Sequence, residues 1–325
     1  MPATASQSVA RSEPTVTVVI VPRERFGHAL RSLASVLATV DPTVDVVYVD
    51  GNSPPAIAAE LETVARTRGM RLMRHDRFLS PNEARNLGLA EVRTRYAVCI
   101  DNDGEFEPGW LDLLVRCAEE TGAWAVAPLY FEGSPGKGIV HMACGTARIS
   151  EEDGRRTFRS EHTHAHRHVS ELEPALRRCE TELFEFHCVL LRMEPLRSLL
   201  PLDEALLSNH EHEDLALAIR EAGGTIWMEP ASRMTYVFGA LDAYDAQYAS
   251  LRWSDDWNRR SAERFRVRWR LHPGWGESSV DWCNGHREML LRTARPRPVA
   301  RPSWIGRGAR AMLGARLYEK LRRSV

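Results

Sequence analysis

The chain has 325 residues, a formal net charge of -1, 43% hydrophobic residues and 27% charged residues. This composition is typical of a globular protein with one principal core, and the sequence offers no uninterrupted apolar stretch of about 18 residues to span a bilayer. The balanced charge argues against nucleic acid as a partner. The six cysteines lie singly and form no CxxC pair, which favours reduced thiols and a cytoplasmic location.

Strand-like and helix-like patterns alternate in the first part of the chain. An apolar run at Val16–Val21 predicts a strand covered on both faces, and helical periodicity follows over Ala29–Val40. The same succession then predicts a strand at Val44–Asp50, a helix at Ala56–Arg66 and a strand at Met70–Arg74. Such repeated units predict an α/β fold with a mostly parallel sheet flanked by helices.

The next helix has a clear start. Ser80, Pro81 and Glu83 supply its N-cap, its first-turn proline and the acid of a capping box. A buried strand at Tyr96–Ile100 follows and ends in the run Asp101-Asn102-Asp103-Gly104. Because open α/β sheets bind ligands at the carboxyl ends of their strands, we expect the chemistry to lie at this run.

Regular patterns become sparser in the second half. Residues 133–173 are rich in glycine, charge and histidine, which predicts loops with short hairpins. The other expected elements are helices at Pro108–Thr121 and Glu211–Ala222, a long, mostly helical segment at Asp242–Arg270, and strands at Trp124–Ala127, Glu182–Arg192 and Thr225–Met228. The expected domains are a disordered lead-in without a secretory signal at 1–14, an α/β domain at 15–240, a helical extension packed on the core at 241–295, and a basic amphipathic tail at 296–325.

The tail has an uneven charge, with nine Lys or Arg residues against the single acid Glu319 from residue 295 onwards. Its apolar residues lie near one helix face, so it is expected either to contact an anionic membrane or to dock on the chain's own domain. The first alternative would place the protein peripherally at the inner face of the membrane. Nucleic-acid binding by the tail is not expected, because few aromatic residues are interleaved with the basic ones.

The pair Asp101 and Asp103 places two carboxylates two residues apart, which suits a hard divalent cation that bridges the phosphates of a nucleotide. The same pattern alone also occurs in solvated turns. Three further polar segments follow separate β-α units, at residues 22–26, 50–53 and 82–86. Together these segments are expected to line one edge of the sheet, which favours the nucleotide-site interpretation.

Four segments, TVTVVIVP, VVYVDGNS, PNEARNLGLA and RYAVCIDND, resemble the family 2 glycosyltransferases of the GT-A fold in order and spacing. The resemblance covers Thr15–Gly239 and implies a Rossmann-like sheet. It also implies metal-dependent, inverting transfer from a nucleoside diphosphate sugar to a hydroxyl acceptor, with Mn²⁺ or Mg²⁺ as cofactor.

The resemblance implies roles for individual residues. Asp50 would contact the base, Asp101 would lie near the ribose and metal, and Asp103 would ligate the metal. Arg85 and Asn86 match an ArN element near the nucleotide, and the other residues expected to bind the nucleotide sugar are Pro22, Arg23, Asn52 and Asn102. The alternatives are that Asp50 caps a turn and that Arg85 pairs with a surface acid.

The first loop departs from the family pattern, because Pro22-Arg23-Glu24-Arg25 replaces the usual Pro-Thr-Tyr-Asn. An arginine there would supply charge to the diphosphate or stack on the base, unless the loop is simply a solvated one. The loop contains no glycine, which argues against a nucleotidyltransferase. A non-catalytic nucleotide-sugar-binding or scaffold protein on the same fold is a further alternative.

The run Glu211-His212-Glu213-Asp214-Leu215 resembles the family's Glu-Asp-x-Asp-Leu element, whose acid lies near the acceptor hydroxyl. Inverting transfer needs a base, and Glu211 is the first candidate, His212 the second and Asp214 the third. Asp214 would alternatively serve the positive end of the helix.

Other histidines and tryptophans have weaker patterns. His141 and His187 are each candidates to complete the metal shell, as expected in particular of His187, or to contact the acceptor. The alternative for both is a hydrogen-bonded core histidine. The alternating histidines at 162, 164, 166 and 168 would share one face of a strand and could then form a zinc site. No partner cysteine lies nearby, so a mobile, titratable loop is the preferred interpretation. Trp253, Trp257 and Trp269 are expected to pack in a core rather than to form a sugar platform.

Overall fold

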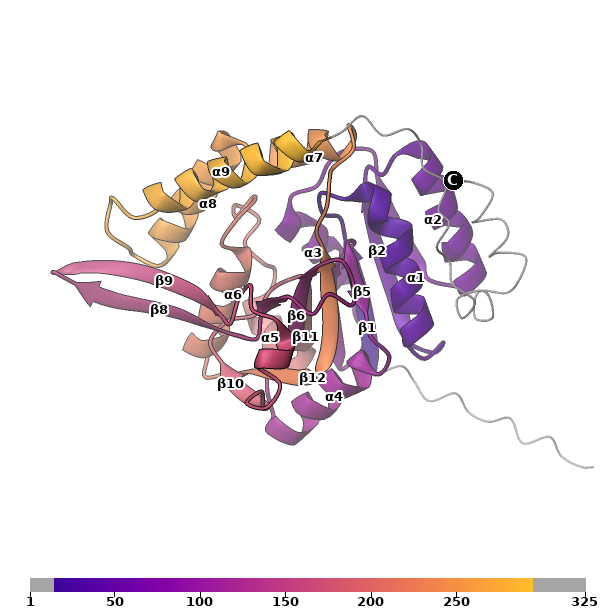
Figure 1. The fold of residues 1–325 in the computed structure, drawn as a ribbon, viewed down its shortest axis with the longest axis horizontal. Coiled ribbons are helices and arrows are strands. Elements are labelled where there is room, and N and C mark those ends of the chain that lie inside the picture. Colours follow the sequence, from indigo (N-terminus) through magenta and orange to yellow (C-terminus); the bar gives the residue numbers. More distant parts are fainter. Residues whose placement is uncertain (1–14, 295–325) are drawn as a thin grey trace, which may run out of the picture.

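The computed structural model describes residues 15–294, which form a mixed sheet with helices packed on it and a helical extension across one end (Figure 1). The lead-in expected at 1–14 and the tail expected at 296–325 lie outside the described residues. The ten-stranded sheet has the order β10-β12-β6-β11-β4-β1-β2-β3, with β5 beside β12 and β7 beside β6. Its strands are β1 (Val16–Val21), β2 (Asp45–Gly51), β3 (Arg71–His75), β4 (Tyr96–Asp101), β5 (Gly104–Phe106), β6 (Ala125–Gly133), β7 (Val140–Met142), β10 (Cys179–Thr181), β11 (Cys188–Arg192) and β12 (Ile226–Val237).

The helices lie around this sheet and in the extension. They are α1 (Ala29–Thr39), α2 (Pro55–Arg68), α3 (Pro81–Ala90), α4 (Trp110–Thr121), α5 (Met193–Leu196), α6 (Glu211–Glu221), α7 (Asp245–Arg252), α8 (Asp255–Arg268) and α9 (Glu277–Thr293). Within residues 15–294, none of them combines the length and the apolar character that a membrane crossing needs.

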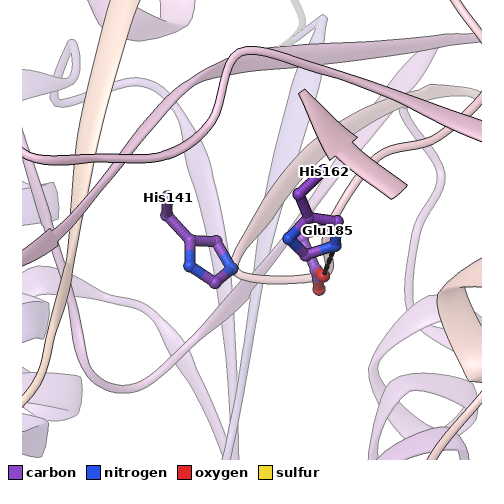
Figure 2. Close-up of side chains that lie close together, drawn as sticks. All are labelled: His141, His162 and Glu185. Atoms are coloured by element: carbon purple, nitrogen blue, oxygen red, sulfur yellow. Dashed lines mark ion pairs between the residues drawn. The ribbon is translucent and has the colours of Figure 1, made fainter. Parts of the chain in front are cut away.

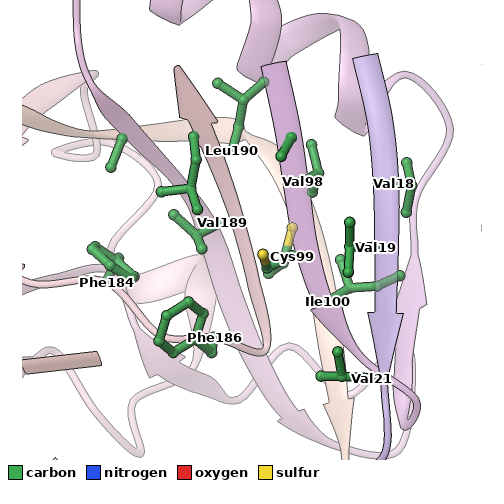
Figure 3. Close-up of a cluster of buried hydrophobic side chains, with 14 of the residues drawn as sticks. Val18, Val19, Val21, Val98, Cys99, Ile100, Phe184, Phe186, Val189 and Leu190 are labelled. Atoms are coloured by element: carbon green, nitrogen blue, oxygen red, sulfur yellow. The ribbon is translucent and has the colours of Figure 1, made fainter. Parts of the chain in front are cut away.

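The N-terminal half of the sheet is parallel. Strand β1 lies between β4 and β2 in parallel register, and β2 pairs in parallel with β3. Every residue of β1 and β4 is buried, which confirms the covered strands predicted from their apolar runs. Figure 3 shows the side chains of β1 and β4 beside those of β11, which runs antiparallel to β4. The carboxyl ends of β1, β2 and β4 therefore meet at one edge.

Helix α3 fits tightly between its cap and the sheet. Ser80 and Glu83 form the predicted capping box, in which each side chain accepts a hydrogen bond from the other residue's backbone. Farther along, a Cβ at Gly88 would collide with Val19 of β1 and approach Val49 Cγ2 at 3.3 Å. The glycine thus lets α3 lie directly on the parallel strands.

The predicted strand boundaries in the second half were wrong. Strand β11 is confined to Cys188–Arg192, and residues 182–187 leave the sheet instead of extending it. Strand β12 continues far beyond Met228, to Val237. Its length is set by tertiary pairing, because it runs parallel to β6 along most of its course and antiparallel to β5 near its end.

The segment expected to be irregular contains a long hairpin, β8 (Cys144–Glu152) and β9 (Arg155–Thr163), rather than short ones. Most of its side chains are at least partly exposed, so the alternation that predicts a half-buried strand is missing. Phe158 is its buried contact with the extension, where its ring lies 4.9 Å from that of Phe265. Figure 1 shows the hairpin projecting beside α8 and α9.

The helices α7, α8 and α9 of the extension pack on the α/β core. Trp253 and Trp269 are 3% and 5% exposed in hydrophobic clusters, which confirms core packing for these two side chains. Trp257 is only partly buried. The Trp269 indole N–H also donates to Asp214 Oδ1 at 2.8 Å, so the extension is tied to helix α6.

Candidate functional site

The carboxyl ends of three parallel strands place acidic side chains at one edge. Asp50 lies at the end of β2, and Asp101 ends β4 next to Val21 of β1. Asp50 is 1% exposed, accepts a hydrogen bond from the Ser53 amide at 2.9 Å and pairs with Arg74. Asp50 therefore caps the turn that follows β2, which was the alternative role given to it in the sequence analysis.

Asp101 and Asp103 are buried together with His187, which comes from the segment before β11. One ligand atom from each of these three side chains lies within 4.8 Å of the others. The Nδ1 atom of His187 is 3.2 Å from Asp101 Oδ2. Asp103 Oδ1 is buried and, among residues 15–294, has no hydrogen-bond partner.

These three side chains have the chemistry of a divalent-metal site. An unpartnered, buried carboxylate oxygen is costly unless a cation or a donor satisfies it. Carboxylate oxygens suit Mg²⁺ and Mn²⁺, and a neutral imidazole adds a ligand that a transition ion accepts. Asp101, Asp103 and His187 therefore fit such an ion.

Protonation of the three side chains follows from their burial and from the arginines. Burial alone would raise the pKa of Asp101, but Arg23, the contact with His187 and Arg85 together hold it well below its usual value. Burial raises the pKa of Asp103 to about 7, against the opposing effect of Arg23 and Arg25. Burial and Arg23 lower the pKa of His187 to about 4, so its imidazole is neutral at neutral pH, as ligation requires.

The altered first loop directs its arginines at the acid pair. Arg23 Nη1 lies 2.9 Å from Asp101 Oδ2, and its backbone amide donates to Asn102 Oδ1 at 2.8 Å. Arg25 Nη1 lies 3.4 Å from Asp103 Oδ2. The loop after Pro22 is thus not a solvated charged loop, because its cations balance the charge of the buried acids.

Glu211 lies in a second set of buried ion pairs beside the first. Its Oε1 atom is 3.2 Å from Arg252 Nη2 and 3.7 Å from Arg85 Nη1, and Arg85 Nη2 also reaches Asp101 Oδ1 at 3.3 Å. Arg85 therefore bridges the acid pair and Glu211. This position contradicts the alternative in which Arg85 pairs with a surface acid, since its side chain is 1% exposed.

The other two candidate bases face different neighbours. His212 Nε2 lies 3.5 Å from Glu185 Oε1. Asp214 accepts a hydrogen bond from the Trp269 indole N–H and forms an ion pair with Arg268 at 2.7 Å. Burial raises the pKa of Asp214 to about 6. Of the three candidates, only Glu211 pairs with a residue that also contacts Asp101.

Two predicted nucleotide-site residues have structural partners instead of contacts with the acids. The Asn86 side chain accepts from the Leu202 amide at 2.8 Å and donates to the Leu202 carbonyl at 2.9 Å. It therefore holds the loop before α6. Asn52 has a left-handed backbone conformation, with φ of 72°, and its carbonyl oxygen accepts a hydrogen bond from the Tyr244 hydroxyl at 2.5 Å.

Sequence reasoning missed several side chains of the network. Tyr236 accepts a hydrogen bond from Arg25 Nη1 at 3.1 Å, and its ring stacks on His187 at a centroid distance of 4.1 Å. Arg252 joins Glu211 to Glu24, which also accepts the Trp253 indole N–H at 2.8 Å. Arg25 and Glu24 were visible as unusual loop residues, but no local motif marks Tyr236 or Arg252.

The alternating histidines do not share one strand face. His162 lies at the end of β9 and is partly buried, whereas His164 and His166 have left-handed φ angles of 64° and 63°. The left-handed residues break the period of two. His162 instead approaches Glu185 and His141 (Figure 2).

Two sequence comparisons bear on this arrangement. The family model described as "Glycosyl transferase family 2" matches residues 17–200. The chain is 33% identical over 110 residues to the "Succinoglycan biosynthesis protein ExoO" of Rhizobium meliloti (strain 1021), which is 34% of this chain and 31% of that protein. The matched region thus spans about a third of that relative's length.

A solved structure, described as "Crystal structure of GalNAc-T7 with UDP, GalNAc and Mn2+", shares the fold of this chain. It matches with a TM-score of 0.53 and 15% sequence identity. The match covers 87% of this chain and 57% of that one. The likeness therefore extends over most of this chain but little more than half of the other.

Proposed function

Because the chain belongs to glycosyl transferase family 2, we propose that it transfers a sugar from a nucleoside diphosphate sugar to a hydroxyl acceptor. The observation that carries the proposal for the site is the unpartnered Asp103 Oδ1 atom, buried beside Asp101 and His187 at the ends of parallel strands. The solved structure with the same fold was determined with UDP, GalNAc and Mn²⁺, which supports a nucleotide-sugar donor and a divalent ion.

We assign Asp101, Asp103 and His187 to the ion, Mn²⁺ or Mg²⁺, which would supply positive charge to the departing diphosphate. Arg23, Arg25 and Arg85 surround the same acids and would contribute further donors to the phosphates. In this proposal the cationic first loop takes part in donor binding, with Pro22 turning the chain at the end of β1.

We assign base recognition to the edge at β2. The Asp50 carboxylate is held by a hydrogen bond from the Ser53 amide and by an ion pair with Arg74. Asn52 lies two positions after Asp50 in the chain. A carboxylate fixed in this way accepts N–H groups of a base in one orientation. Asn102, whose side-chain oxygen binds the Arg23 amide, positions the first loop over the donor.

Glu211 is the proposed base of an inverting transfer. Its carboxylate would accept the acceptor's hydroxyl proton while that oxygen attacks the anomeric carbon and the bond to the diphosphate breaks. Arg85 and Arg252 hold the carboxylate in place from two sides. His212 is the second choice, since its imidazole also accepts a proton but faces Glu185.

The direct test is a panel of nucleotide sugars with Mn²⁺, measured by donor binding and by release of the nucleoside diphosphate. Asp103→Asn should abolish metal-dependent donor binding. The matched control is Asp112→Asn, because Asp112 is an exposed acid on α4 that the proposal does not use. Binding without release of diphosphate in the presence of every acceptor class would favour the non-catalytic alternative, and no binding of any donor would overturn the proposal.

A further inference from the structure

A second group of metal-ligand side chains lies outside the acid pair. His141 of β7, His162 of β9 and Glu185 of the segment between β10 and β11 each offer one ligand atom, all within 4.8 Å of one another. Figure 2 shows the two imidazole rings and the carboxylate grouped together, although they come from three separate parts of the chain. The side chains are 19%, 28% and 12% exposed, so the group is accessible without lying on the open surface.

The spacing of the group suits an ion. Zinc binds imidazole nitrogen and carboxylate oxygen at roughly 2.0–2.2 Å in tetrahedral geometry, which separates neighbouring ligand atoms by about 3.3–3.5 Å. His162 Nε2 lies 3.0 Å from Glu185 Oε1, close to that separation. The His141 and His162 rings have centroids 5.1 Å apart at an interplanar angle of 73°. Ion binding would bring the three ligand atoms, which lie within 4.8 Å of one another, closer to this separation.

His141 has the outer partner that metal-bound histidines typically have. Its Nδ1 atom lies 3.0 Å from Glu132 Oε2, so that carboxylate does not engage the Nε2 atom. A carboxylate on one ring nitrogen fixes the tautomer and the ring orientation, and strengthens the other nitrogen as a ligand. Figure 2 shows a ring nitrogen of His141 facing His162. Ion pairs with Glu132 and Glu185 hold the two imidazoles in this arrangement, which leaves the second ring nitrogen of His141 beside His162 and Glu185.

We propose that His141, His162 and Glu185 bind a divalent transition-metal ion of the zinc class, with Glu132 as the outer partner of His141. Two imidazoles and one carboxylate select such ions over Mg²⁺, which prefers oxygen ligands. The ion would join β9 to β7 and to the segment before β11. Three protein ligands leave a fourth position for water or an oxygen of a bound molecule.

The proposed site is separate from the acid pair but borders it. The ring of His187, which contacts Asp101, lies 5.5 Å from that of His141. The two groups share no ligand, and the histidine group offers two imidazoles and one carboxylate where the acid pair with His187 offers one imidazole and two carboxylates. Metal binding at the histidine group therefore does not depend on the proposed glycosyl transfer.

The test uses the full chain, freed of metal with a chelator and dialysed. Zn²⁺ is titrated against a chromophoric chelator in excess Mg²⁺, and Co²⁺ is added separately as a spectroscopic probe of imidazole coordination. The expected result is one Zn²⁺ equivalent that Asp103→Asn retains and that His141→Ala and His162→Ala lose. Glu132→Gln should weaken the affinity by roughly 10–100-fold, as loss of an outer partner does.

The matched control is His164→Asn, which changes an exposed histidine two positions from His162 and suits its left-handed backbone. This variant should bind Zn²⁺ like the original chain. Circular dichroism checks that each variant is folded. Equal Zn²⁺ stoichiometry and affinity in His162→Ala and the original chain, or no bound equivalent in the original chain, would overturn the proposal. Loss of Zn²⁺ only in Asp103→Asn would assign the ion to the acid pair and overturn it as well.

Discussion

The guanidinium of Arg252 lies 3.2 Å from the carboxylate of Glu211, although the two residues are separated by 41 positions in the chain. The contact connects the end of α7 in the extension with the first turn of α6. Arg252 also lies 3.3 Å from Glu24 of the first loop. The extension therefore orients the proposed base and the first loop at the same time.

Replacement of Glu211 by Gln should lower kcat for transfer by about 10²–10⁴-fold, the usual contribution of a positioned base. Donor affinity should change less than kcat, because Glu211 reaches the proposed donor site only through Arg85, which keeps its contact with Asp101. Steady-state kinetics together with donor titration would measure both quantities. His212→Asn is the comparison, and a larger loss of kcat in His212→Asn than in Glu211→Gln would assign the base to His212.

Replacement of Arg25 by Met should destabilise the protein without metal and increase its affinity for Mn²⁺. Arg25 is paired with the buried Asp103, so its loss leaves Arg23 to offset that charge and raises the pKa of Asp103 further, at a cost of about 1.4 kcal/mol per pKa unit. Without the competing guanidinium, we expect Mn²⁺ to bind roughly tenfold more tightly, which corresponds to about one pKa unit of charge interaction.

Thermal unfolding with and without Mn²⁺ and electron paramagnetic resonance of free Mn²⁺ would check the Arg25→Met prediction. Mn²⁺ should raise the melting temperature more in the variant than in the original chain, because binding to the folded state stabilises it. Arg31→Met is the control on α1, where the arginine pairs with Glu105 outside the acid pair. Unchanged Mn²⁺ affinity in Arg25→Met would contradict the competition between the guanidinium and the ion.

Glu213 should make stability depend on pH in the acid range. Burial would raise its pKa, but the charge and hydrogen bond of His210, with His212 and Ser160, lower it from 4.5 to about 2. A carboxyl whose pKa is lowered on folding contributes stability above its unfolded pKa. That contribution, about 3 kcal/mol, is lost as the pH falls from about 4.5 toward 2.

Denaturant unfolding of Glu213→Gln at several pH values would check this dependence. The difference in unfolding free energy from the original chain should be largest near neutral pH and should shrink below about pH 4.5. Glu221→Gln is the control, because Glu221 is an exposed acid on the same helix. A difference that stays constant with pH would show that the Glu213 carboxyl does not titrate with a lowered pKa.

Cys144 and Cys179 should form a disulfide when the protein is treated with diamide. Their sulfur atoms are 3.1 Å apart on β8 and β10, and the hydrogen bond with Cys144 lowers the pKa of Cys179 to about 7. A thiolate at neutral pH is the reactive form. Diamide takes up the two electrons and the two thiol protons.

Peptide mapping should find Cys144 and Cys179 linked, and Cys144→Ser should remove the link. Linkage of any other described cysteine would contradict the prediction, since the other four are buried.

Some features of the protein were determined by the sequence over short distances. The apolar run Val16–Val21 predicted β1 with the bounds that the structure has, and Ser80 with Glu83 predicted the start of α3, because strand burial and helix capping depend on neighbouring residues. The acids at the end of β4 were also recognisable in advance. Parallel pairing then brings the strand ends together at one edge, as the alternating pattern predicts.

Tertiary structure alone decided which side chains meet at that edge. Arg252 and Tyr236 reach the first-loop residues from more than 200 positions away, and the Asp214 carboxylate turns to Trp269 across 55 positions. The length of β12 and the histidine group likewise depend on neighbours from other elements. Such contacts follow from the packing of whole helices and strands, whereas a local pattern records only the hydrophobicity and conformational preference of residues adjacent in the chain.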